Sequence, residues 1–144
     1  MQVEFVMVAD AAQVVGGKLY VLGGAWNQYR CAAFPAQVSL AIIASILVET
    51  EETGRELPVV VVLAGEDGIP ILPEAQANLQ VGRVESARGP HRALFTLSAN
   101  VQIPRAGRYT AQVTAGDART SVWFDVFFAG KTVAVGPSGT EQLH

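Results

Sequence analysis

The sequence is poor in the residues that build catalytic and metal centres. It contains one cysteine, Cys31, and two histidines, His91 and His144. A single cysteine excludes an internal disulfide and a cysteine metal site, and we interpret Cys31 as a small buried hydrophobe. A nucleophile needs a neighbouring base and an orienting group, and neither histidine stands in such a pattern. We therefore expect no catalytic residue and a protein that is not an enzyme.

Motifs for cofactors and metal ions are equally scarce. The pairs Gly16-Gly17 and Gly23-Gly24 flank a short apolar run and are typical of turns, not of a phosphate-binding loop that opens a helix. Calcium needs several converging carboxylates, whereas the candidates lie singly in separate predicted turns: Asp10, Glu66, Asp67 and Asp117. We expect no cofactor and no metal ion.

Charge is also low, at 16% of residues with a net charge of −3. Residues 49–82 carry seven acidic side chains and one basic one, while residues 83–131 carry seven basic and three acidic ones. This asymmetry can orient neighbouring copies, or it reflects solvated turns that keep the protein in solution. Because a nucleic-acid surface is basic with interleaved aromatics, the acidic total makes nucleic acid an improbable partner.

No stretch of the sequence is suited to crossing or targeting a membrane. The longest apolar run, residues 38–48, is far shorter than the ~20 residues that a spanning helix needs. The first residues lack the basic segment and apolar core of a secretory signal. We expect no membrane association and a cytoplasmic location.

What the sequence does contain is apolar residues in the period of β-strands. Half of the 144 residues are hydrophobic, enough to bury a core in one domain. Apolar residues alternate with polar ones from Phe95 to Ile103 and again from Tyr109 to Ala115, and every second residue from Val122 to Phe128 is apolar. This alternation predicts three consecutive antiparallel strands that share one apolar face, which a second layer must cover.

The remaining segments complete an all-β prediction. We expect strands at 2–9, 18–22, 38–48, 57–64 and, as an edge strand weakened by Pro70 and Pro73, at 69–84. A short strand is expected at 132–135, a helical turn at 10–13, an irregular segment at 25–33 and an acidic turn at 49–56. The fold class is thus an antiparallel β-sandwich with Greek-key connections, of the immunoglobulin-like or C2-like type, with about eight strands and little helix. Residues 1–135 form one domain, and residues 136–144 are a polar tail.

Two stretches resemble known proteins. The segment Pro104-Arg-Ala-Gly107-Arg-Tyr109 is similar to the corner of immunoglobulin-like sandwiches, which implies that the Tyr109 hydroxyl bonds back to the upstream backbone. The pattern Ala9-Asp-Ala-Ala12, Gly17-Lys-Leu19, Gly23-Gly-Ala-Trp26 and Phe34-Pro35 resembles a family of small bacterial all-β proteins of unknown function. That resemblance implies no activity, ligand or catalytic residue.

The polar and aromatic segment around Trp26 is the first candidate site. Trp26, Asn27, Tyr29 and Arg30 form a loop of the kind that stacks on sugars or anchors a protein partner. The alternative is that Trp26 plugs the open end of the sandwich. A second alternative is a small sandwich hydrolase that uses Trp26, Tyr29 and nearby carboxylates.

The second candidate is a subunit interface. If Phe124 and Phe128 point inward, Trp123 and Phe127 must lie on the other face of the same strand. In the first strand, Val6 and Val8 lie opposite Val3, Phe5 and Met7. Apolar residues on both faces indicate cover by a neighbouring subunit. We therefore predict a non-enzymatic binding or assembly module that forms a homo-oligomer or binds another protein, with small-ligand or carbohydrate binding as the alternative.

Overall fold

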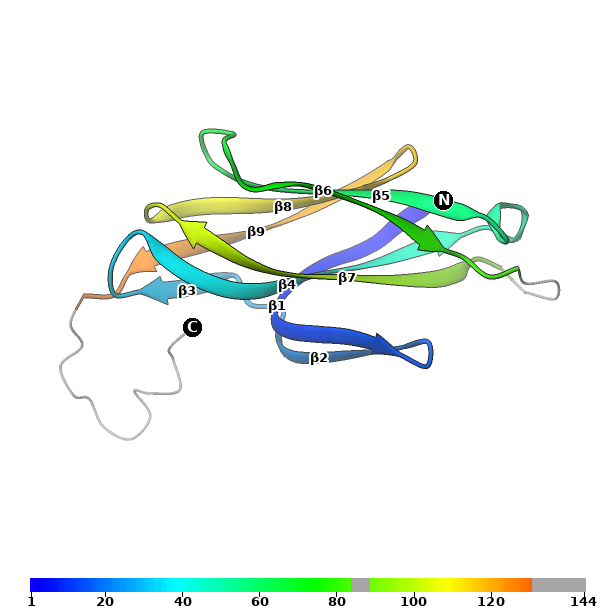
Figure 1. The fold of residues 1–144 in the computed structure, drawn as a ribbon, viewed down its shortest axis with the longest axis horizontal. Coiled ribbons are helices and arrows are strands. Elements are labelled where there is room, and N and C mark those ends of the chain that lie inside the picture. The colour runs from blue at the N-terminus through cyan, green and yellow to red at the C-terminus, as the bar shows by residue number, and fades with distance from the viewer. Residues whose placement is uncertain (84–88, 131–144) are drawn as a thin grey trace.

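The protein is a sandwich of two β-sheets (Figure 1). A computed structural model of the chain describes residues 1–83 and 89–130. The strands of the described residues are β1 (Gln2–Val15), β2 (Lys18–Gly24), β3 (Gln28–Cys31), β4 (Ala36–Val48), β5 (Glu56–Gly65), β6 (Pro70–Gln80), β7 (His91–Ile103), β8 (Gly107–Ala115) and β9 (Ala118–Phe128). The expected all-β sandwich is confirmed, with nine strands in this part of the chain. The expected strand at 132–135, the tail 136–144 and residue 84, the end of the expected strand 69–84, lie outside the described residues.

The two sheets have the orders β2-β1-β4-β7 and β3-β9-β8-β5-β6. All pairings are antiparallel except that of β3 with β9, which is parallel. The prediction that residues 95–128 form three neighbouring strands of one sheet is wrong, because β7 pairs with β4 while β8 pairs with β5 and β9. Alternation specifies which face of a strand is apolar, but the turn at Pro104 carries the chain from one sheet to the other.

The core lies between the inner faces of the two sheets. Strand β4 is central in its sheet and is buried on both faces, since every residue from Leu40 to Ile46 is buried. Facing it across the core are the inward residues of β5, β8 and β9, including Val61, Val113 and Phe124. In β7, the predicted inward residues Phe95, Leu97, Ala99, Val101 and Ile103 all belong to or pack against this core.

A β-bulge changes which residues of β1 face the core. The pairing of β1 with β4 shifts register between Val3 and Phe5, so Val3, Val6 and Val8 share the inner face. Because a shift of one residue moves every following side chain to the other face, Phe5 and Met7 lie on the outer face. The prediction that placed Val6 and Val8 opposite Val3 is therefore wrong at the bulge, which no alternation pattern reveals.

The first strand continues well past its predicted end. Residues 10–13 belong to β1 and do not form the expected helical turn. Pairing with β4 ends at Ala9, and from Ala11 to Val15 the strand with which β1 pairs, among those the structure describes, is β2. The result is a two-stranded ribbon that projects from the body of the sandwich at the lower edge of Figure 1. We call residues 11–22 the β1–β2 arm.

Two further segments differ from their predicted form. The segment 25–33 contains β3, which pairs with the end of β9. The acidic turn 49–56 contains a 3-10 helix at Thr50–Glu52. Strand β6 is an edge strand, as its two prolines predict.

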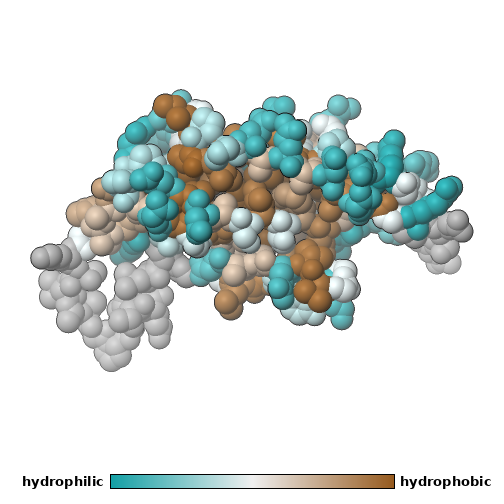
Figure 2. All heavy atoms as spheres, in the orientation of Figure 1, coloured by the Kyte–Doolittle hydropathy of each residue, from teal (hydrophilic) through white to brown (hydrophobic). Residues whose placement is uncertain are grey.

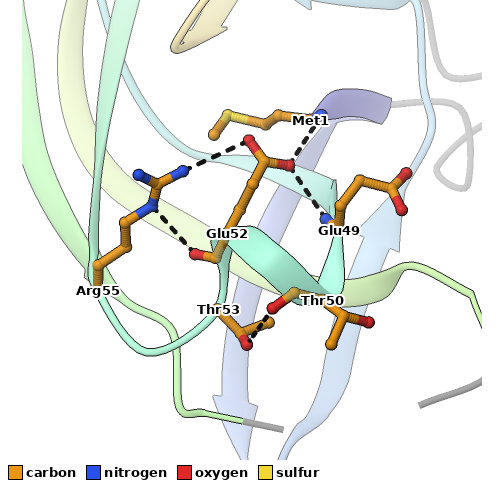
Figure 3. A network of polar contacts seen from close by, with 6 residues as sticks. All are labelled: Met1, Glu49, Thr50, Glu52, Thr53 and Arg55. Carbon is orange, nitrogen blue, oxygen red and sulfur yellow. Dashed lines mark hydrogen bonds and ion pairs between the residues drawn. The ribbon is translucent and has the colours of Figure 1, made fainter. Parts of the chain in front are cut away.

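The acidic turn is held by contacts of its own (Figure 3). A Glu52 carboxylate oxygen accepts a 3.1 Å hydrogen bond from the Glu49 amide and lies 3.0 Å from the amine of Met1. The bond to this amine is the main reason that the pKa of Glu52 lies below its ordinary value. The Nε of Arg55 donates to the Glu52 carbonyl oxygen at 3.2 Å. Charged groups of the acidic turn, Glu52 and Arg55 among them, are therefore engaged in contacts that stabilise this end of the sandwich.

Candidate functional site

Trp26 lies in the connection that carries the chain from one sheet to the other. The Ala25 amide donates to the Val8 carbonyl at 2.9 Å, and the Asp125 amide donates to the Asn27 carbonyl at 2.8 Å. These backbone bonds fix both ends of the connection, one to β1 and one to β9. Trp26 is thereby placed over the opening between the two sheets.

The Trp26 side chain packs inward. Its ring meets Phe124 edge to face, with centroids 5.3 Å apart, and lies 5.3 Å from the ring of Tyr29. Both Trp26 and Tyr29 are half-buried against the core, and burial raises the pKa of Tyr29. Asn27 and Arg30 are exposed. The structure thus divides the predicted loop into two inward aromatics, which close the core, and two outward polar residues.

An apolar hollow of about 340 Å³ adjoins Trp26. Its lining comes from β1, the connection and β9: Phe5, Val6, Met7, Val8, Ala25, Trp26, Asn27 and Val122. No carboxylate, imidazole or thiol is among these lining residues. A hydrolase needs a general acid or base within reach of its substrate, and the hollow provides none from the described residues.

A second hollow, of about 250 Å³, is found at the polar end of the sandwich. It lies between the β5–β6 turn and the corner that precedes β8. The charged groups here are paired: the Arg108 amide donates to Glu66 at 2.7 Å, and Arg105 forms an ion pair with Asp67. The Tyr109 hydroxyl donates a 2.6 Å hydrogen bond to the Arg105 carbonyl, the upstream bond expected of this residue. This bond ties Tyr109 to the turn between Pro104 and Gly107, and the charged groups named above, which line the hollow, already have partners.

Metal binding has no support in this part of the chain. Within residues 1–83 and 89–130, no three side chains of His, Cys, Asp or Glu gather closely enough to hold a metal ion. His91 is the first residue of β7 and not a loop residue, and no described group lies within hydrogen-bonding distance of its Nε2. Cys31 is buried, and burial raises the pKa of its thiol.

Trp123 and Phe127 lie on the outer face of β9. Trp123 is 41% exposed and Phe127 44% exposed, and the adjoining Phe128 is 64% exposed. The predicted outward orientation is therefore found, and no described loop covers these rings. We call Trp123 and Phe127 the aromatic face. The prediction that Phe128 points inward with Phe124 is wrong, because the core ends at Val126 and Phe128 is exposed at the last position of β9.

A neighbouring ion pair holds the indole of the aromatic face in place. The guanidinium of Arg108 lies over the Trp123 ring, 3.8 Å from its centroid. Asp125 fixes this guanidinium from the other side, with bonds of 2.8 and 3.2 Å, and Arg108 in turn lowers the pKa of Asp125. Such an arrangement orders a large side chain before any partner arrives, which reduces the entropy lost on binding.

Val8 does not belong to an interface. It is 1% exposed and packs in the core of its own chain, while Val6 packs partly against the core at the hollow beside Trp26. The bulge in β1 explains this correction, since it turns both valines inward. The outer face of the strand instead carries Phe5 and Met7, which are half-buried.

The β1–β2 arm carries an exposed apolar surface that the sequence patterns did not predict. Five of its large hydrophobic residues are exposed: Val14, Val15, Tyr20, Val21 and Leu22. Figure 2 shows hydrophobic atoms at the lower edge of the molecule, where the arm projects. The available signal was the glycine pair at 16–17, which predicts a tight hairpin. Its lack of a covering layer depends on where β4 stops pairing, which is a long-range property.

These features define a class of protein: a two-sheet β-sandwich with mostly antiparallel strands and with exposed apolar side chains on its surface. Among the described residues, no helix has the length and hydrophobicity to cross a lipid bilayer. The chain belongs to DUF6941, a family of unknown function whose model matches residues 4–124. This agrees with the resemblance to an uncharacterised family, and the diagnostic value of the quoted glycine and tryptophan spacings stays a prediction. No curated protein matches the sequence.

Proposed function

We propose that this protein is a non-enzymatic binding or assembly module that associates with further copies of itself. The observation that carries the proposal is the gathering of exposed large hydrophobic side chains on two surfaces, the β1–β2 arm and the aromatic face. Isolated exposed hydrophobics are ordinary, but contiguous apolar patches mark interaction sites. Burial of such surface is the main favourable term in protein association.

The shape of the arm strengthens this proposal. A two-stranded hairpin is marginally stable in water without a layer over it, and within residues 1–83 and 89–130 no third strand pairs with residues 11–15 and 18–22. A partner that covers the arm supplies the missing layer. The low density of charge, 16% of residues, also favours association over dispersion.

Light scattering of the purified protein tests the proposal. We expect a molar mass that is a multiple of 15.2 kDa and that falls when apolar residues are replaced. Trp123→Ser tests the aromatic face, and Tyr20→Ser with Leu22→Ser tests the arm. Ser121→Thr, at an exposed position on β9, is the matched control. A wild-type mass of 15.2 kDa at every concentration would remove the self-association.

A second candidate function is the binding of a small apolar ligand in the hollow beside Trp26. The observation in its favour is the apolar lining of a space of about 340 Å³, which lies within the usual range of ligand pockets. Carbohydrate binding is less well supported, because its stacking ring, Trp26, is packed against Phe124 and Tyr29. Quenching of tryptophan fluorescence by a panel of apolar ligands, compared between wild type and Val6→Trp, tests this candidate.

A further inference from the structure

Strand β2 is the open edge of the β1–β2 arm. Among the described residues it pairs with β1 on one side only, and no other described strand lies beyond it in its sheet. An edge strand presents unpaired N–H and C=O groups to any strand that can approach. In Figure 1 this edge lies farthest from the body of the sandwich, so the approach is open.

The other three sheet edges carry features that discourage pairing, and β2 does not. Strand β6 contains Pro70 and Pro73, which lack amide donors. Strand β3 has only four residues, and the exposed residues of β7 are polar: Arg92, Ser98, Asn100 and Gln102. In β2, by contrast, there is no proline, and the only charged residue is Lys18 at its first position.

We propose that β2 pairs antiparallel with β2 of a second copy, so that two four-stranded sheets join into one continuous sheet. This inference rests on the self-association proposed above and names its partner and its contact. A twofold axis perpendicular to the sheet passes midway between the two Val21 residues, because Val21 is the central residue of the seven-residue strand and this register pairs β2 along its whole length. Tyr20 then faces Leu22 of the second copy, and Lys18 faces Gly24 of the second copy.

Charge and side-chain pairing both favour a second copy in this orientation. Antiparallel pairing places the two Lys18 residues at opposite ends of the interface, whereas parallel pairing would bring like charges together. Aromatic and branched aliphatic side chains that face each other across strands stabilise a sheet, and the axis creates the Tyr20–Leu22 pair twice. Each Lys18 meets a glycine, which leaves room for its side chain to extend to water.

The turn geometry shows which backbone groups are free to pair. Val15 and Lys18 are joined by a two-residue turn, and the residues that flank such a turn exchange hydrogen bonds with each other. Because hydrogen-bonded and non-hydrogen-bonded pairs alternate along an antiparallel ladder, Leu19 and Val21 direct their N–H and C=O groups away from β1. Val21 therefore supplies the two central hydrogen bonds of the proposed interface.

The first test removes only the outward amide of Val21. Val21→Pro lacks this donor and suits an edge position, whereas Val21→Thr keeps the donor and a branched side chain. We expect a molar mass of twice 15.2 kDa for wild type and Val21→Thr, and half that value for Val21→Pro. Circular dichroism checks that Val21→Pro keeps its strand content.

The second test keeps the backbone donors of β2 intact and measures the proposed register directly. Tyr20→Cys and Leu22→Cys are oxidised mildly, each alone and after mixing. In the proposed register these positions form a non-hydrogen-bonded pair with Cα atoms roughly 4.5 Å apart, within the range for a disulfide. We expect the mixed sample to form several times more disulfide-linked dimer than either variant alone. Ser121→Cys, on the other sheet, is the control that should not cross-link, and native Cys31 is buried.

The outcomes separate this inference from the proposed function. A wild-type monomer overturns both. An associated wild type whose mass is unchanged by Val21→Pro, or whose mixed cysteine variants do not cross-link, overturns the β2 contact and leaves association through another surface. Cross-linking of Tyr20→Cys alone at the level of the mixture also overturns the proposed register.

Discussion

Strands β4 and β2 both carry apolar residues on their two faces, but they lie in opposite environments. Residues 40–46 of β4 are buried, whereas Tyr20 is 52% exposed and Leu22 72% exposed. The difference lies in the neighbours: β4 has a strand on each side and a second sheet across the core, while β2 has one strand and no second layer. A strand that is apolar on both faces therefore lies either at the centre of a sheet or at an exposed edge, and its residue pattern does not distinguish the two positions.

The largest expected difference in stability is between a leucine-to-alanine substitution in β4 and the same substitution in β2. Leu40→Ala, at a residue 2% exposed, should lower the free energy of unfolding by about 3 kcal/mol, since it leaves a cavity in the core. Leu22→Ala should change it by less than about 0.5 kcal/mol in the monomer. Urea denaturation at a concentration that keeps the chain monomeric measures both values. Equal losses would show that the arm is covered within its own chain.

The two tryptophans allow a second comparison, between a ring that packs into the core, Trp26, and a ring on the outer face of β9, Trp123. Trp26→Ala should lower the free energy of unfolding by about 2 kcal/mol, because a half-buried ring that packs on Phe124 is lost. Trp123→Ala should lower it by roughly 0.5–1 kcal/mol, the contribution of the cation–π contact with Arg108. The same urea titration measures both. A loss for Trp26→Ala no larger than for Trp123→Ala would favour a binding loop over a core plug.

A smaller effect is expected from the two tyrosines at the corner and the arm. Tyr109→Phe removes the hydrogen bond to the Arg105 carbonyl and should lower the free energy of unfolding by about 1 kcal/mol. Tyr20→Phe removes an exposed hydroxyl and should have no measurable effect. Thermal unfolding of both variants, followed by circular dichroism, compares them. If Tyr109→Phe were neutral, the corner would not depend on this bond.

The smallest effect concerns the bulge of β1 and depends on pH. Glu4 accepts hydrogen bonds from Arg92 and Ser45, and the bonds from Arg92 above all lower its pKa to about 2. Because the folded-state pKa lies below the unfolded one, this stabilisation is present above about pH 4.5 and is lost as pH falls through about 2. Urea midpoints at pH 6, 4 and 2 should decline more for wild type than for Glu4→Gln. The exposed Glu51→Gln is the control, and parallel declines for wild type and Glu4→Gln would contradict the role of Glu4.

Much of the fold could be predicted because strand alternation is a local property. The inward faces of β7 and β8 and the outward position of Trp123 follow from a period of two residues. The β1 bulge could not be predicted in this way, since one inserted residue reverses the faces of Val6 and Val8 without any change in composition. The sheet to which β7 belongs could not be predicted either. Turn residues such as Pro104 end a strand, but they do not determine which strand the next one pairs with.

The candidate site could also be predicted only in part, because its local composition is visible in the sequence whereas its long-range contacts are not. The loop at Trp26 is recognisable by composition, but whether its rings pack inward depends on Phe124, nearly a hundred residues later in the chain. The exposure of the β1–β2 arm depends on the end of the β1–β4 ladder at Ala9. Both are properties of pairing between distant segments, and a single sequence does not specify them.

Hydrogen exchange of the β2 amides, compared with those of β4, tests the central claim most directly. At low concentration the β4 amides should exchange slowly and the amides of Leu19 and Val21 quickly. At concentrations where the molar mass has doubled, the Leu19 and Val21 amides should become protected while β4 stays unchanged. If the mass doubles and these two amides still exchange at the monomer rate, the arm is not the surface at which the copies meet.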